Sequence, residues 1–233
     1  FVRSVNGVIM RRSPLRQPLT RRTVVLLVIL LMPLLTCSAG CAVLYQLAYG
    51  DGHMIEAKYQ GLKGQRVAVV CVMNPAYYGD GATSTMLAER VERILGAHVD
   101  DVELVRQDEV ADWMDNNDWD ETDYVEIGRG SGADMVVAID VEAFSTHESK
   151  TLLKGRAEVT TTVYDVAQGG KELFRTRDHN FVFPTSHSIP VIANDARDFE
   201  RTFLEMLAEH IAKNFYDYDM AEDFARDGAA YAH

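Results

Sequence analysis

The stretch from Arg66 to Met73, which reads RVAVVCVM, constrains the fold more than any other part of the chain. From Val67 onward every residue in it is apolar, at odd and even positions alike. Successive side chains of a strand point to opposite faces of a sheet, so a strand of this composition must be covered on both faces. The sequence therefore predicts a central strand with a packed layer on each side of it.

The segments after this strand alternate in hydrophobic period. Apolar residues recur at helical spacing from Met86 to Leu95 and again from Phe199 to Phe215, where Asn194 or Asp195 is the expected start of the helix. Asp108 and Asp120 are the expected caps of two short helices. Further strands are expected at 102–105, 134–144, 155–166 and 171–183, with Gly169-Gly170 as a hairpin turn between the last two.

The strand at 155–166 alternates clearly between two kinds of side chain. One face carries apolar residues, and the other carries Arg156, Glu158, Thr160 and Thr162, which is typical of a half-exposed antiparallel strand. The order β-α-β-α-β-β-β-α predicts one α/β (α+β) domain with a mixed sheet. We expect this domain at 64–216, after a tether at 41–63 and before a C-terminal tail at 217–233.

The first forty residues have the pattern of a bacterial export signal, expected as a signal peptide over 1–40. Arg21 and Arg22 precede an apolar run at 24–35, which only Pro33 interrupts, and small residues at 38–40 lead into Cys41. The run is too short to span a bilayer as a stable helix. Met10 followed by two arginines is a conventional signal start, so residues 1–9 are not expected in the natural product.

The exit from this segment resembles the lipobox of bacterial lipoproteins, in which a cysteine becomes the lipidated N-terminus. We expect Cys41 to carry the lipid, palmitate included, because small residues directly precede it. Cys37 is the alternative, with Leu34 three residues before it but Thr36 immediately before it. Ala42 agrees with sorting to the outer membrane. The resemblance implies a protein of the cell envelope that is anchored in the membrane by its lipid and faces the periplasm.

Charge limits the partners of such a protein. Residues 1–40 contain six Arg and no acid, so the 193 residues that follow carry 17 basic and 35 acidic side chains, a formal charge of −18. A surface of this kind repels nucleic acid and anionic headgroups, so no nucleic-acid partner is expected. Cys71 lies in the apolar strand and is expected as a small core residue.

A wider resemblance is carried by RVAVVCV, MLAERVERILG, EIGRGSGADMVVAIDV and RAEVTTTVYDVAQGGKELF. Together these segments resemble the periplasmic α/β domain of the curli-assembly (CsgG-like) lipoproteins and the related amino-terminal domain of TolB-type proteins, over roughly 64–216. The resemblance implies the fold, the lipid anchor and a scaffolding role. Residues 144–155 read as a short polar turn, so the long membrane-inserting hairpins of the curli pore lipoproteins are not expected.

Candidate binding and catalytic residues are few. Tyr77 and Tyr78 follow the first strand, where loops of α/β sheets often bind, so they are the expected partner-contact pair. Gly79-Asp80-Gly81 lacks the third glycine of a dinucleotide site, and no cofactor is expected. The acidic segment at 112–123 lacks the spacing of a calcium loop, and the seven His lack that of a zinc site, so no metal is expected.

The sequence thus predicts a lipid-anchored binding or scaffolding protein of the envelope that is not an enzyme. Envelope proteins or a second copy of the chain are its expected partners. An auxiliary lipoprotein of an envelope transport or secretion complex is the alternative. A hydrolase using Ser186 and His187 is a distant third reading, because no nucleophile elbow accompanies the pair.

Overall fold

The computed structural model describes residues 54–73, 81–117, 123–193 and 195–219. Cys41, the signal segment and the Tyr77-Tyr78 pair lie outside these residues. No helix among the described residues is long and apolar enough to cross a membrane. The strands are β1 (Met54–Ile55), β2 (Arg66–Met73), β3 (Glu103–Leu104), β4 (Met135–Ser149), β5 (Leu152–Asp165), β6 (Lys171–Phe183), β7 (Ile189–Pro190) and β8 (Tyr218–Asp219). The helices are α2 (Ala82–His98), α3 (Gln107–Asn116), α4 (Tyr124–Gly130) and α5 (Ala196–Ala212), with a 3₁₀ turn at Val191–Ala193.

The main sheet is mixed and has the order β3-β2-β4-β5-β6. β2 runs parallel to β3 and β4, whereas β4, β5 and β6 form an antiparallel meander. β7 adds a short antiparallel pairing at the start of β5, and β1 pairs with β8 as a separate ribbon. The α/β class, the mixed sheet and the place of β2 between two other strands agree with the sequence-based expectation.

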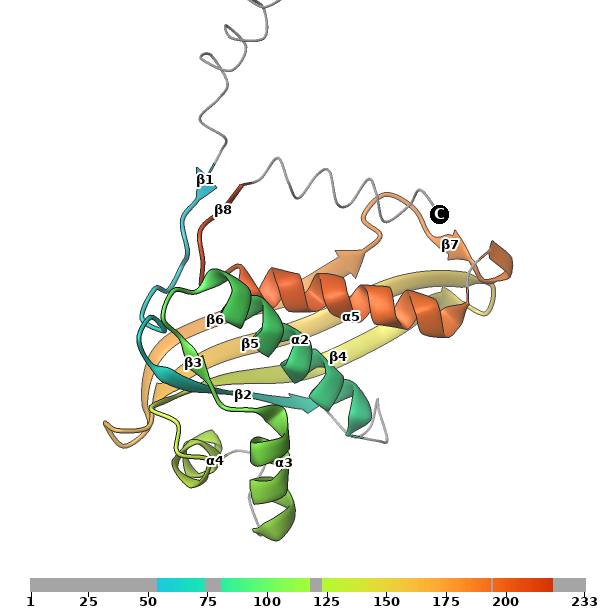
Figure 1. Ribbon diagram of the computed structural model, residues 1–233. Helices are drawn as coiled ribbons and strands as arrows, with labels where there is room; N and C mark the ends of the chain where they lie inside the picture. Colours follow the sequence, from blue (N-terminus) through green and yellow to red (C-terminus); the bar gives the residue numbers. More distant parts are fainter. Residues whose placement is uncertain (1–53, 74–80, 118–122, 194, 220–233) are drawn as a thin grey trace, which may run out of the picture. The chain divides into compact units, whose positions relative to one another are not determined.

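β2 is buried on both faces, as its composition predicts. Val67 and Val69 enter one apolar core, which α2 and α5 cover, while Ala68 and Val70 enter a second core, which α3 and α4 cover. The four side chains are at most 2% exposed. Figure 1 shows the two helical layers on opposite sides of the sheet. The molecule is therefore a three-layer sandwich in which β2 is shared by both cores.

The second layer is short and lies close against the sheet. Gly128 of α4 is buried, and a Cβ atom added there would lie 2.3 Å from Cγ2 of Val136 on β4. A glycine is needed at this point because the helix backbone approaches the strand so closely. α4 is capped by Asp123, whose carboxylate accepts a hydrogen bond from the backbone N–H of Glu126 at 3.0 Å.

Three local expectations differ from the structure. Residues 144–155 are the end of a long hairpin rather than a polar turn, because Phe144 and Leu153 are buried under α5. Asp108 is not a helix cap, since α3 begins at Gln107 and Asp108 pairs with Arg106 instead. The cap of α4 is Asp123, whereas Asp120 lies outside the described residues.

The packed part of the chain also extends past the expected boundaries at 64 and 216. Leu62 is fully buried, and the backbone N–H of Tyr59 donates to the carbonyl of Asn214 at 2.9 Å. β1 and β8, which lie outside the expected boundaries, pair with each other as two short antiparallel strands. Residues 54–63 and 217–219 therefore pack with the domain that was expected between them.

We predict that Val69→Asp and Val70→Asp each lower the free energy of unfolding by several kcal/mol, on the order of 4, because each buries an unpaired carboxylate. The two variants probe the two cores separately. Urea unfolding of the purified domain measures both, and Ala167→Asp at an exposed turn residue is the control. Near-normal stability of Val70→Asp alone would show that α3 and α4 do not cover the sheet in solution.

Candidate functional site

The second face of the sheet is only partly covered by the described helices. α3 and α4 lie over β2 and the beginning of β4, and no described helix lies over the rest of that face (Figure 1). The uncovered part carries charged side chains from three neighbouring strands, which we call the ionic face: Glu142, Arg156, Glu158, Arg175, Arg177 and His179.

Arg177 lies at the centre of the ionic face. Its guanidinium donates to the carboxylate of Glu142 and, at 2.9 Å, to that of Glu158. His179 Nδ1 lies 3.0 Å from the same Glu158 oxygen, and the hydroxyl of Thr160 donates to Glu142 at 3.1 Å. The hydrogen bond from His179 and then that from Arg177 lower the pKa of Glu158. Glu158 is therefore held as a carboxylate.

Glu142 lies on this face of β4 two residues after Asp140, at the usual spacing of a strand, and a bulge follows it. The register between β4 and β5 shifts between Val141 and Ala143, so that Ala143 is paired with Glu158. The bulge therefore changes the side of the sheet on which the residues after Glu142 lie. Beyond the bulge, a groove of about 440 Å³ is bordered by Arg156, Glu158 and His179. Its polar rim is thus continuous with the ion pairs around Arg177.

The core under α3 and α4 borders the ionic face at a hydrogen bond between Tyr124 and Asp140. The hydroxyl of Tyr124, on α4, donates to the carboxylate of Asp140, and the ring of Tyr124 stacks on that of Tyr164 at 6.1 Å. Burial raises the pKa of Asp140, while the Tyr124 hydroxyl and the nearby charge of Arg175 oppose that shift. Burial also raises the pKa of Tyr124, so the phenol remains the donor.

The expected exposure of Thr160 and Thr162 is wrong. They are 6% and 1% exposed, although they lie on the polar face of β5. The register places Thr160 beside Arg177 and Thr162 beside Arg175, and long arginine side chains cover the short threonines between them. Of the four residues that were expected to be exposed on this face of β5, only Arg156 and Glu158 reach solvent.

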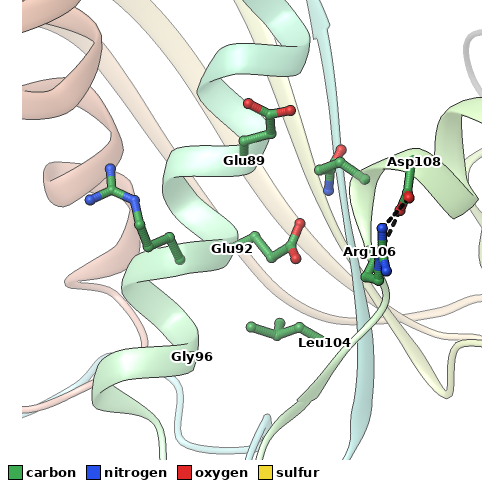
Figure 2. Close-up of a pocket in the computed structure, with 8 residues that line it drawn as sticks. Glu89, Glu92, Gly96, Leu104, Arg106 and Asp108 are labelled. Carbon is green, nitrogen blue, oxygen red and sulfur yellow. Dashed lines mark hydrogen bonds and ion pairs between the residues drawn. The ribbon is translucent and has the colours of Figure 1, made fainter.

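A second concavity lies at the other edge of the sheet, between α2 and the segment that joins β3 to α3. It has a volume of about 480 Å³ and is lined by Glu89, Glu92, Leu104, Arg106 and Asp108 among others. Figure 2 shows Glu92 pointing toward Arg106, which pairs with Asp108. Burial raises the pKa of Glu92, and the charges of Glu89 and Asp108 add to that shift. Of the two arginines in the lining, Arg106 pairs with Asp108 and Arg93 pairs with Glu205 of α5.

Gln107, which also lines this groove, caps the free edge of β2. Its side-chain amide donates to the carbonyl of Val69 at 2.9 Å, at the edge of β2 that β3 no longer covers. The amide thus takes the place of the next backbone donor of β3.

Of the sequence-predicted residues, those that the structure describes are not brought together with either surface, and Cys41, Tyr77 and Tyr78 lie outside the described residues. Ser186 Oγ lies 2.9 Å from His187 Nδ1, and both residues are exposed in the loop before β7. Asp112 and Asp115 are exposed on α3, whereas Asp123 serves as a helix cap. Within the described residues, no group of three His, Cys, Asp or Glu side chains could hold a metal ion.

Comparison with known proteins finds no matching family model and no matching curated protein. Among solved structures, the PelC dodecamer from Paraburkholderia phytofirmans has a TM-score of 0.43 and 10% identity, covering 70% of this chain and 97% of that chain. Lipoprotein GNA1162 from Neisseria meningitidis has a TM-score of 0.37 and 16% identity, covering 69% and 98%. Hypothetical protein CT253 from Chlamydia trachomatis has the same score and identity, covering 73% and 99%. Membership of the CsgG-like or TolB-type group stays a prediction.

We predict that the domain gains stability relative to an Asp140→Asn variant as the pH falls from 7 toward 4. The folded-state pKa of Asp140 lies above its ordinary value, so its ionised form disfavours folding at neutral pH. That penalty disappears as the carboxylate binds a proton, and the asparagine variant has no such penalty to lose. Urea midpoints of both proteins across this range measure the effect, and parallel pH profiles would contradict it.

Proposed function

We propose that the chain is a lipid-anchored periplasmic protein of the cell envelope that binds or scaffolds partners and does not catalyse a reaction. Its lipid is carried by Cys41, at the outer membrane. The order of positive residues, short apolar run, small residues and cysteine supports the anchor. The ionic face is the observation that supports binding.

Two properties make the ionic face suited to recognition. Its charges stand on paired strands, so the backbone beneath them is rigid, and each carboxylate is held by a neighbouring cation or hydroxyl. Charges fixed in place in this way select a partner whose own charges are complementary. The groove beside Arg156 and His179 gives the surface a concave region in which a partner side chain fits.

The same pairing argues against a catalytic role for this surface. Glu158 has a lowered pKa, so near neutral pH it is a poor proton acceptor and has no proton to donate. Arg177 is occupied by two carboxylates at once. Catalysis would require Glu158 or Arg177 to be free to act on a substrate. A binding partner can contact the paired side chains without breaking their ion pairs.

We predict that Cys41→Ser abolishes fatty-acid incorporation and leaves the protein soluble or as unprocessed precursor. Metabolic labelling with an alkyne fatty acid, followed by membrane fractionation, measures both effects. Cys37→Ser is the matched control and should label normally. If labelling is lost with Cys37→Ser and kept with Cys41→Ser, Cys37 is the residue that carries the lipid.

We predict that a photo-crosslinking amino acid at His179 captures a discrete envelope protein, or a second copy of the chain, in living cells. His179 suits the probe because its side chain is 70% exposed on the ionic face. The control is Arg197, an exposed residue on α5, on the opposite side of the sheet. Arg156→Ala, which removes a charge beside the probe but none from the core, should weaken the adduct. Equal capture at both probe positions would contradict specific binding by the ionic face.

A further inference from the structure

One apolar side chain differs from the others among the described residues by its exposure. Ile192 has an exposed fraction of 101%, against 60% for Met54, and the other large apolar residues that the structure describes are more covered. A single exposed aliphatic residue is common on soluble proteins and indicates nothing by itself. What distinguishes Ile192 is the rigid backbone that presents it and the charge of the residues around it.

Ile192 lies in the 3₁₀ turn between β7 and α5, and this turn is fixed on both sides. β7 pairs with the beginning of β5, and the backbone N–H of Val191 donates to the carbonyl of Thr151 at 3.0 Å. On the other side, the carboxylate of Asp195 caps α5. Ile192 is therefore held beside the turn that joins β4 to β5, at one end of the sheet (Figure 1). We call residues 144–156 and 184–193, which form this end, the hairpin end.

The hairpin end is basic, whereas the rest of the chain is strongly acidic. It carries Lys150, Lys154 and Arg156 against a single acid, Glu148, which gives a formal charge of +2. The remaining residues after position 40 therefore sum to −20, because the total after that position is −18. Glu148 is held by Arg156 at 3.4 Å and by the hydroxyl of Ser188, so both lysines are left without an ion-pair partner in the part of the chain that the structure describes.

We infer that the hairpin end makes contact with a lipid surface that bears anionic headgroups. Ile192 enters the boundary between headgroups and acyl chains, while Lys150 and Lys154 remain at the level of the headgroup charges. This division follows from the chemistry of the side chains, because an aliphatic group gains free energy by leaving water and an ammonium group does not. The acidic remainder of the chain is repelled by the same surface, so the hairpin end is the part that can approach it.

The size of the contact favours a bilayer over a protein partner. A specific protein interface buries more than about 1,000 Å² with good complementarity, which one exposed isoleucine and two lysines cannot supply. A bilayer needs no matching pocket, and each lysine near its surface is attracted by many headgroups at once. Such a contact is weak, so it holds the domain only where the domain is already near a membrane. In this respect the inference rests on the proposed lipid at Cys41, whereas the contact itself is made entirely by described residues.

An environment-sensitive dye tests the contact in vesicles. The full lipidated protein, with Cys71→Ser, carries an NBD dye at Thr151→Cys beside Ile192, or at Ala167→Cys in the exposed turn between β5 and β6. The protein is reconstituted into phosphatidylcholine vesicles, with or without phosphatidylglycerol as a minority component. We expect the anionic vesicles to raise the NBD emission at position 151 several-fold and to leave that at position 167 unchanged. No rise at position 151, or an equal rise at both positions, would overturn the inference.

Substitutions identify the side chains that are responsible. Ile192→Ser should abolish most of the rise, and Lys150→Gln and Lys154→Gln should each lower the equilibrium constant of the contact by about fivefold. The matched controls are Met54→Ser and Lys171→Gln, which change an exposed apolar residue and an exposed basic residue outside the hairpin end. Equal losses in the control variants would contradict the inference.

Two further measurements separate this contact from the lipid anchor and from a protein partner. With Cys41→Ser, flotation on neutral vesicles should be lost, and retained flotation would show that the proposed anchor is wrong. In that case the effect of Ile192→Ser on binding to anionic vesicles, at millimolar lipid, still decides the inference. If the dye at position 151 responds to envelope proteins but not to protein-free anionic vesicles, the hairpin end binds a protein and the inference is wrong.

Discussion

The structure depends on the burial of β2 from both sides. A strand with apolar side chains on both faces is unstable until each face is covered, and full burial of each such side chain stabilises the fold by roughly 1.5–3 kcal/mol. α2 and α5 cover one face of β2, and α3 and α4 cover the other. Because β2 lies near one edge of the sheet, the second helical layer needs to cover only that edge.

The ionic face follows from this uneven cover. α4 is seven residues long and reaches the sheet through Gly128, so its cover ends at the contact between Tyr124 and Asp140. Beyond that point the strands carry Glu142, Arg177 and their neighbours, which pair with one another across β4, β5 and β6. The short apolar layer covers only part of the long antiparallel meander, and the uncovered part is a charged surface that contains the groove beside Arg156 and His179.

Local sequence patterns predict much of this arrangement. Two-sided apolarity identifies β2, helical spacing identifies α2 and α5, and Asp195 is the cap of α5, as expected, through its bond to the N–H of Arg197. The length of the β4–β5 hairpin is not predicted, because polar residues hide the buried alternation of Phe144, Thr146 and Leu153. Phe144 packs against Phe203 of α5, which lies far away in the sequence.

The ionic face itself could be predicted only in part. Arg175, Arg177 and His179 alternate along β6 with the period of a strand, so the sequence does indicate one charged row. Glu142 follows Ala138 and Asp140 at strand spacing, but the pairing of β4 with β5 that brings it to Arg177 depends on the register of distant strands. The partial burial of Asp140 likewise depends on a tyrosine from another layer. Tyr77, Tyr78 and Cys41 lie outside the described residues, and their roles stay predictions.

If the ionic face binds a partner, it is exposed in the isolated protein and occupied in the cell. Maleimide labelling of a single cysteine at His179, in the Cys71→Ser background, tests it directly when rates in the purified protein and in intact cells are compared. We expect fast labelling of the purified protein and several-fold slower labelling in cells, with an Arg197→Cys control that shows no such slowing. Equal ratios of the two rates at both positions would show that the ionic face is not occupied in the cell.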